Sequence, residues 1–111
     1  MKNRHQGRRV PQTIRVGGHD IRVARANRVD EKDAHGSFDD EHLVITLREA
    51  YVNSYLEVDV ILHELLHAIW WDGGLEKGDD EERIVRVMAT RLMQVWRDNP
   101  ELMKFITSGV K

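Results

Sequence analysis

The chain has 111 residues, of which 41% are hydrophobic and 32% charged, and its formal net charge is −2. This composition is typical of one soluble globular domain, and no apolar run approaches the roughly 18 residues needed to span a membrane. The absence of cysteine excludes disulfides and thiolate metal sites, so any metal must bind nitrogen or oxygen. Met1 to Arg9 lacks the apolar core of a secretory signal, so we expect a cytoplasmic protein.

Positive charge is concentrated at the N-terminal end. Residues 1–29 contain eight Lys or Arg and one acidic residue, whereas residues 30–111 contain nine basic and eighteen acidic residues. We predict a flexible basic arm over residues 1–12, then a single domain over residues 13–111. The basic region is interpreted either as a weak DNA contact or as a solvated surface beside an acidic body. No aromatic residues lie between the arginines to stack on bases.

Three strands are expected next. Thr13–Val16 and Asp20–Ala24 alternate apolar and polar residues around two glycines, which predicts a β-hairpin with one buried face. The following segment, 27–36, is polar, and we expect a turn at its last residue, Gly36. His42–Leu47 is rich in β-branched residues and is predicted as the third strand of a small antiparallel sheet.

The hydrophobic period then changes to that of a helix. Ser54 and Glu57 have the spacing of a capping box, and Gly73-Gly74 marks the end of the predicted helix. Its apolar positions recur at helical spacing: Val58, Ile61, Leu62, Leu65, Leu66 and Ile69.

A second and a third helix follow. Asp79 or Asp80 is expected to cap the second helix, whose apolar side is formed by Ile84, Val85, Met88, Leu92, Val95 and Trp96. Asn99 as the cap and Pro100 as the first residue predict a short last helix through about Thr107. Three strands followed by three helices indicate a small α+β domain.

The first helix carries His63-Glu64-Leu65-Leu66-His67. Four residues advance a helix by about 400°, so the two histidines share one face and can bind one metal ion at roughly 2.0–2.1 Å. Glu64 lies at the edge of that face, where it can accept a proton from a water held by the metal. This pattern predicts one catalytic Zn²⁺, with Glu64 as the general base.

A catalytic zinc usually has three protein ligands, so a third must come from elsewhere. Glu81 and Glu82 open the second helix after a short turn and are the best donors. Helical geometry favours Glu81 if the metal lies over the apolar face, because Glu82 projects about 90° away. Glu82 also fits a local capping role at the third helical position.

These two helical motifs resemble the small gluzincin-type metallopeptidases, which include SprT-like and ImmA/IrrE-like domains and short phage-encoded peptidases. The resemblance covers roughly residues 13–97 and implies a zincin-like fold. In this group a ligand glutamate is followed by apolar residues two, five and six positions later. Counting from Glu82 reaches Ile84, Val87 and Met88, so the resemblance implies that His63, His67 and Glu82 bind the zinc, with Glu81 as the alternative.

The resemblance also implies a zinc metalloendopeptidase that acts on a protein or peptide. The strand before the zinc helix, Leu43 to Leu47, is expected either to offer its edge to an extended substrate, as the resemblance implies, or to be an ordinary interior strand. Arg86 occupies the position where the group often has a residue supporting a zinc histidine, which leaves Asp59 as the candidate for that role. Candidate oxyanion donors are His35, His42, Tyr51, Tyr55 and Arg86. The alternative is a non-proteolytic binding or regulatory module that keeps this fold, associated with nucleic acid through its basic region.

Overall fold

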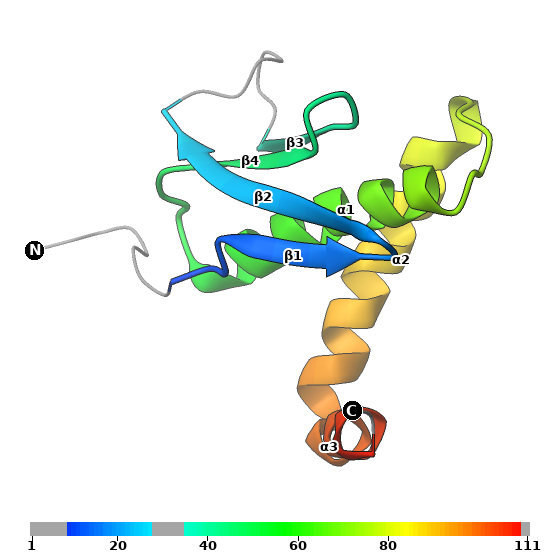
Figure 1. Cartoon of the computed structure of the whole chain (residues 1–111). Coiled ribbons are helices and arrows are strands. Elements are labelled where there is room, and N and C mark those ends of the chain that lie inside the picture. Colours follow the sequence, from blue (N-terminus) through cyan, green and yellow to red (C-terminus); the bar gives the residue numbers. More distant parts are fainter. Residues whose placement is uncertain (1–8, 28–34, 110–111) are drawn as a thin grey trace, which may run out of the picture.

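The computed structural model describes residues 9–27 and 35–109, and the predicted α+β class is confirmed. The elements, in chain order, are β1 (Thr13–Val16), β2 (His19–Ala26), β3 (Gly36–Asp39), β4 (Val44–Arg48), α1 (Ser54–Asp72), α2 (Asp79–Asp98) and α3 (Pro100–Ser108). Figure 1 shows α1 lying against the sheet, α2 running away from it, and α3 at the far end of α2. No helix among the described residues is long and apolar enough to cross a membrane.

The sheet is mixed and has the strand order β1-β2-β4-β3. β1 and β2 form the predicted antiparallel hairpin, in which Ile14 lies opposite Ile21 and Gly17 takes a φ of +58° at the turn. β4 pairs antiparallel with β3 but parallel with β2. The prediction of three antiparallel strands is therefore wrong, since the sheet has four strands and one parallel pair.

The additional strand is β3, in a place where a turn at Gly36 was expected. Its sequence, Gly-Ser-Phe-Asp, has little intrinsic preference for a strand, and pairing with β4, with Phe38 opposite Ile45, holds it extended. The predicted strand His42–Leu47 is found at Val44–Arg48 and lies between β2 and β3. The edge role expected for Leu43 to Leu47 is consequently wrong, because the edge strand on this side is β3.

The main core lies between the sheet and α1. It contains the inward residues of the strands together with one face of the helix: Val16, Ile21, Ile45, Leu47, Tyr51, Val60 and Ala68. Of these, Ile21, Ile45 and Leu47 are fully buried. Burying such aliphatic side chains contributes roughly 1.5–3 kcal/mol each, so this packing holds α1 firmly on the sheet.

The boundaries of α1 differ slightly from the prediction. Asn53 is the N-cap, and its side chain accepts a hydrogen bond from the Leu56 amide at 2.8 Å. Ser54 is thus the first helical residue rather than the cap, and Glu57 is buried beside Arg25, with a 2.6 Å ion pair, instead of closing a capping box. At the other end the predicted glycine stop is confirmed, with Gly74 at a φ of +72°.

Only part of the apolar side of the second helix, α2, packs on α1. Val85, Ala89 and Met93 are its buried residues, whereas Ile84 and Met88, predicted on the same side, are 38% and 46% exposed. The N-cap is Gly78, so neither predicted aspartate caps this helix. Asn99 precedes α3 as predicted, but its side chain bonds back to the Val95 carbonyl at 2.8 Å and does not cap α3. The helix from Pro100 ends at Ser108, within a residue of the expected Thr107.

Candidate metal centre

The two histidines lie side by side on α1, as their spacing predicts. His63 and His67 are both half-buried, and their Nε2 atoms are 3.3 Å apart. Burial lowers the pKa of His63, because desolvation opposes its charged form more than the nearby Glu82 carboxylate favours it. A neutral imidazole is the form that binds a metal ion.

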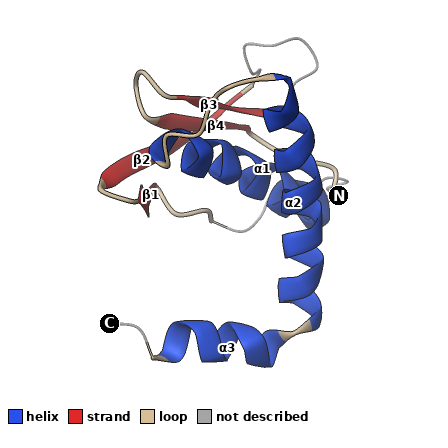
Figure 2. Cartoon of the chain, turned by 90° about the vertical axis from the view of Figure 1, so that its right-hand side faces the viewer, coloured by secondary structure: helices blue, strands red, loops and turns tan. Residues whose placement is uncertain are grey.

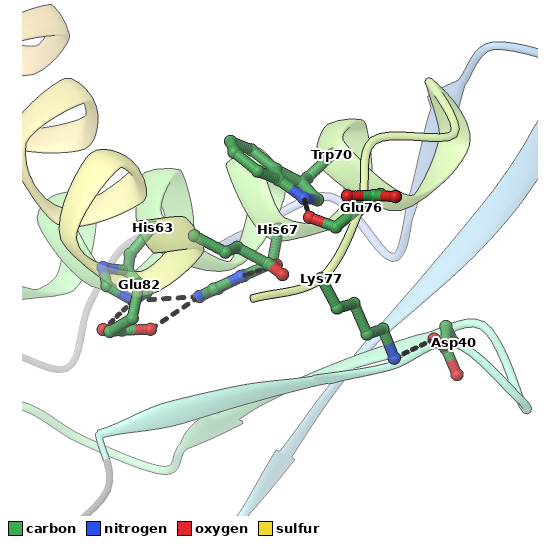
Figure 3. A network of polar contacts seen from close by, with 8 residues as sticks. Asp40, His63, His67, Trp70, Glu76, Lys77 and Glu82 are labelled. Atoms are coloured by element: carbon green, nitrogen blue, oxygen red, sulfur yellow. Dashed lines mark hydrogen bonds and ion pairs between the residues drawn. The ribbon is translucent and has the colours of Figure 1, made fainter. Parts of the chain in front are cut away.

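The short connection after α1 brings the first turn of α2 against these histidines. The two carboxylate oxygens of Glu82 lie 3.0 Å from the Nε2 atoms of His63 and His67, one oxygen facing each ring. Figure 3 shows the Glu82 side chain reaching toward both rings. One carboxylate oxygen and the two imidazole nitrogens lie within 4.8 Å of one another, and so form a three-donor group that could hold a metal ion.

Glu81 also contacts the site, on the other side of His67. Its Oε2 lies 2.6 Å from His67 Nδ1, and both side chains are largely buried. If that nitrogen carries the proton, Nε2 of the neutral ring has only a lone pair to offer. That lone pair faces Glu82 and His63 Nε2. The two histidines and Glu82 can therefore direct their lone pairs to one metal ion.

The donor spacing matches the size of zinc. A tetrahedral zinc ion with bonds of about 2.0–2.1 Å has ligand–ligand edges of about 3.3 Å. The two histidine Nε2 atoms are 3.3 Å apart, and each lies 3.0 Å from a different oxygen of the Glu82 carboxylate. Two nitrogens and one carboxylate are a common donor set for a catalytic zinc with one open position. The residues therefore fit a zinc ion in their chemistry, and the two histidine nitrogens have the spacing of two zinc ligands.

Glu64 lies beside this group with its side chain in the wall of the same cleft. It is only 7% exposed, and burial raises its pKa to about 7. Of two smaller effects, that of His67 lowers this pKa and that of the Glu82 carboxylate raises it. Gly36 of β3 packs directly over it: a Cβ there would lie 2.8 Å from Val60 Cγ1 and 3.3 Å from Glu64 Cγ. A glycine is needed because the strand approaches the helix so closely.

The site opens into a cleft of about 840 Å³ between β3, α1 and the start of α2. Trp70 and Trp71 both line this cleft and are half-buried. Trp70 Nε1 donates to the Glu76 carbonyl at 2.9 Å and fixes the loop before α2. From that loop, Lys77 reaches Asp40 beyond β3 at 3.0 Å, as Figure 3 shows. This exposed ion pair connects the two rims of the cleft.

The remaining sequence candidates divide into two groups. His35 and Arg86 line the cleft and stay candidates for an oxyanion donor. Tyr51 is buried, with its hydroxyl donating to the His35 carbonyl and accepting from the Arg48 amide, so it supports the fold instead. Tyr55 lies under the Arg97 guanidinium, 4.6 Å from its ring centroid, in a different groove.

Two more candidates have local partners. His42 pairs with Asp39 at 2.9 Å in the turn before β4, outside the cleft. Asp59 lines the cleft and accepts a hydrogen bond from Thr90 at 3.1 Å, and its charge raises the pKa of His63 slightly against the effect of burial. The residue that directly contacts a candidate ligand histidine is Glu81, in a role that sequence reasoning did not assign to it.

Comparisons with protein-family models, with curated proteins and with solved structures find no match. The assignment of this centre consequently depends on its own geometry. The predicted DNA contact concerns the basic N-terminal region, residues 1–29, of which 1–8 and 28–29 lie outside the described residues. In the described hairpin, Arg15 pairs with Asp20 at 2.8 Å and Arg25 with Glu57, so part of the basic charge is used within the fold. The DNA contact stays a prediction.

Proposed function

We propose that this protein is a zinc-dependent metallopeptidase whose zinc ligands are His63, His67 and Glu82. The observation that carries the proposal is the pair of histidine Nε2 atoms 3.3 Å apart, each 3.0 Å from an oxygen of Glu82, beside a buried glutamate, Glu64. Buried ionisable groups with shifted pKa values are concentrated at functional sites.

Each residue has a defined part in this proposal. Zinc, when bound, lowers the pKa of a coordinated water from its usual high value toward neutrality. Glu64 accepts the proton of that water and passes it to the leaving amine. Its position beside the donor group suits this exchange, because a general base must lie within reach of the proton that it accepts. Glu81 holds the His67 ring so that Nε2 points to the metal, and acts as a positioning residue.

The substrate is proposed to be an extended peptide lying along β3. That strand is the free edge of the sheet on this side and borders the cleft through Gly36, Ser37 and Phe38. A peptide can add to such an edge by main-chain hydrogen bonds. The close packing of Gly36 over Glu64 supports this proposal, because a peptide beside β3 would lie near the proposed base.

The test is cleavage of a peptide library, read by mass spectrometry, by the zinc-loaded protein and by Glu64→Gln. We expect Glu64→Gln to bind zinc normally but to cleave at least about a hundredfold more slowly. Glu49→Gln, the same change at an exposed position, is the control and should remain active. Cleavage that survives Glu64→Gln or a strong chelator contradicts the mechanism. Absence of cleavage by the zinc-loaded wild type contradicts the activity and favours the non-proteolytic binding module.

A further inference from the structure

The last helix, α3, is exposed to an unusual degree for an apolar element. None of its residues is buried, and Leu102, Phe105 and Ile106 are 41%, 79% and 46% exposed. Their i, i+3, i+4 spacing places these three side chains on one face. Among the helices and strands of the described residues, α3 contacts α2 alone. Figures 1 and 2 show it standing clear of the sheet and of α1.

A helix of nine residues is too short to be stable in water by itself, so α3 needs a surface to cover its apolar face. Its own chain offers a second uncovered stripe, on α2. Ile84, Val87 and Met88 are 38%, 49% and 46% exposed and have the same i, i+3, i+4 spacing. This stripe is separate from the buried face of α2, which packs on α1.

The two stripes do not meet within one chain. Met88 lies twelve residues before Pro100, about 18 Å along the helix axis, and Figure 2 shows α3 leaving the end of α2 in a crosswise direction. We propose that two copies of this chain form a dimer in which the α3 stripe of each copy packs on the α2 stripe of the other. Because each copy supplies both surfaces, the contact is reciprocal and closes with two-fold symmetry.

The charges next to the stripes are complementary. Arg91 continues the α2 stripe one turn after Met88, and Glu101 lies one turn before Phe105 on α3. Glu101 makes only a long contact of 3.9 Å with Lys104 in its own helix, at a strongly exposed position. In the dimer Glu101 of one copy can face Arg91 of the other.

The area is also of the right size. Phe105 alone leaves on the order of 150 Å² open, since a large aromatic side chain buries 150–250 Å². The six side chains together expose on the order of 500 Å² per copy, and the polar groups around them bring the face toward the roughly 800 Å² per partner that a specific dimer buries. Phe105 is the expected anchor, because aromatic side chains dominate such interfaces.

Sedimentation velocity of the full chain over a wide concentration range tests the proposal. We expect a monomer–dimer equilibrium that Phe105→Glu or Met88→Glu weakens by more than about tenfold. Thr107→Glu adds the same charge on the opposite face of α3 and should leave the dimer unchanged. Far-UV circular dichroism checks that all variants keep their helices, and because these positions are exposed we expect that they do.

Cross-linking identifies the contact itself. The chain has no cysteine, so Phe105→Cys protein can be mixed with Met88→Cys protein under mild oxidation. We expect the disulfide between the two different variants to form faster than either symmetric one. A monomer at every concentration overturns the proposal and indicates that a different partner covers α3. A dimer that survives both glutamate variants, or symmetric disulfides that form faster than the mixed one, also overturns it.

Discussion

Burial of Glu64 should make the metal-free protein lose stability as the pH rises. The side chain is 7% exposed and its pKa is raised from 4.5 to about 7. Below pH 4.5 the carboxyl group is protonated in both the folded and unfolded states, so it contributes no pH dependence. Between pH 4.5 and 7 the unfolded chain releases the proton while the folded protein retains it. The free energy of unfolding therefore falls through this window and the loss is complete above pH 7.

The size of the effect follows from the shift. A change of one pKa unit corresponds to 1.36 kcal/mol, so a shift from 4.5 to about 7 costs about 3 kcal/mol at pH 8. Glutamine cannot ionise, and Glu64→Gln removes this cost. We expect the metal-free variant to match the wild type near pH 4.5 and to exceed its free energy of unfolding by about 3 kcal/mol at pH 8.

Urea unfolding followed by circular dichroism, in the presence of a chelator, measures both proteins at each pH. Other titrating groups are common to the two proteins and cancel in the difference. Glu49→Gln, the same substitution at an exposed position, should show no comparable rise with pH. A stability difference between Glu64→Gln and wild type that stays constant from pH 5 to pH 8 would refute the reasoning. It would mean that the pKa of Glu64 is the same in the folded and unfolded states.

Two further predictions concern the side chains around the centre. Glu81→Ala should weaken zinc binding about 10–100-fold, since it removes the group that orients His67. Competition with a chromophoric chelator measures the zinc affinity, with Asp80→Ala at an exposed neighbouring position as the control. Equal zinc affinities of the two variants would contradict the prediction. Arg25→Ala should lower the free energy of unfolding, measured in urea, by about 2 kcal/mol or more, because its partner Glu57 is only 5% exposed. Arg15→Ala breaks an exposed ion pair with Asp20 and should lower it by less than about 1 kcal/mol. Equal losses for the two arginines would show that burial of the pair is unimportant.

The helices could be predicted from the sequence because their signals are local. The apolar period, the glycine stop after Asp72 and the proline at residue 100 each act within a few residues of the chain. The cap at Asn53 was placed one residue late because Ser54 and Glu57 mimic a capping box. Local patterns of this kind resolve elements well but not their last residue.

The sheet was harder to predict because pairing is a property of the whole fold. β3 has no alternating pattern and is a strand only because β4 lies beside it. Whether β4 runs parallel or antiparallel to β2 leaves no local trace in either strand. Because β3 was not predicted, the edge strand was expected at Leu43–Leu47, whereas in the structure it is β3. The neighbouring helix was predicted correctly.

The candidate centre shows the same division. His63, Glu64 and His67 follow from spacing on one helix, and all three lie in the cleft. The choice between Glu81 and Glu82 depended on how α2 lies against α1, which periodicity does not report. Both glutamates reach the site: Glu82 faces both histidines and Glu81 supports one of them. The acidic run 79–82 was the only local signal for the second role.

The central claim is that His63, His67 and Glu82 hold a zinc ion next to Glu64. The most direct measurement is a crystal structure of the zinc-loaded protein, with anomalous diffraction recorded on both sides of the zinc absorption edge. We expect one fully occupied zinc, bonded at about 2.0–2.1 Å to these three residues, with an open fourth position beside the Glu64 carboxylate. A zinc bonded to Glu81 in place of Glu82, or no zinc between the two histidines, would contradict the account.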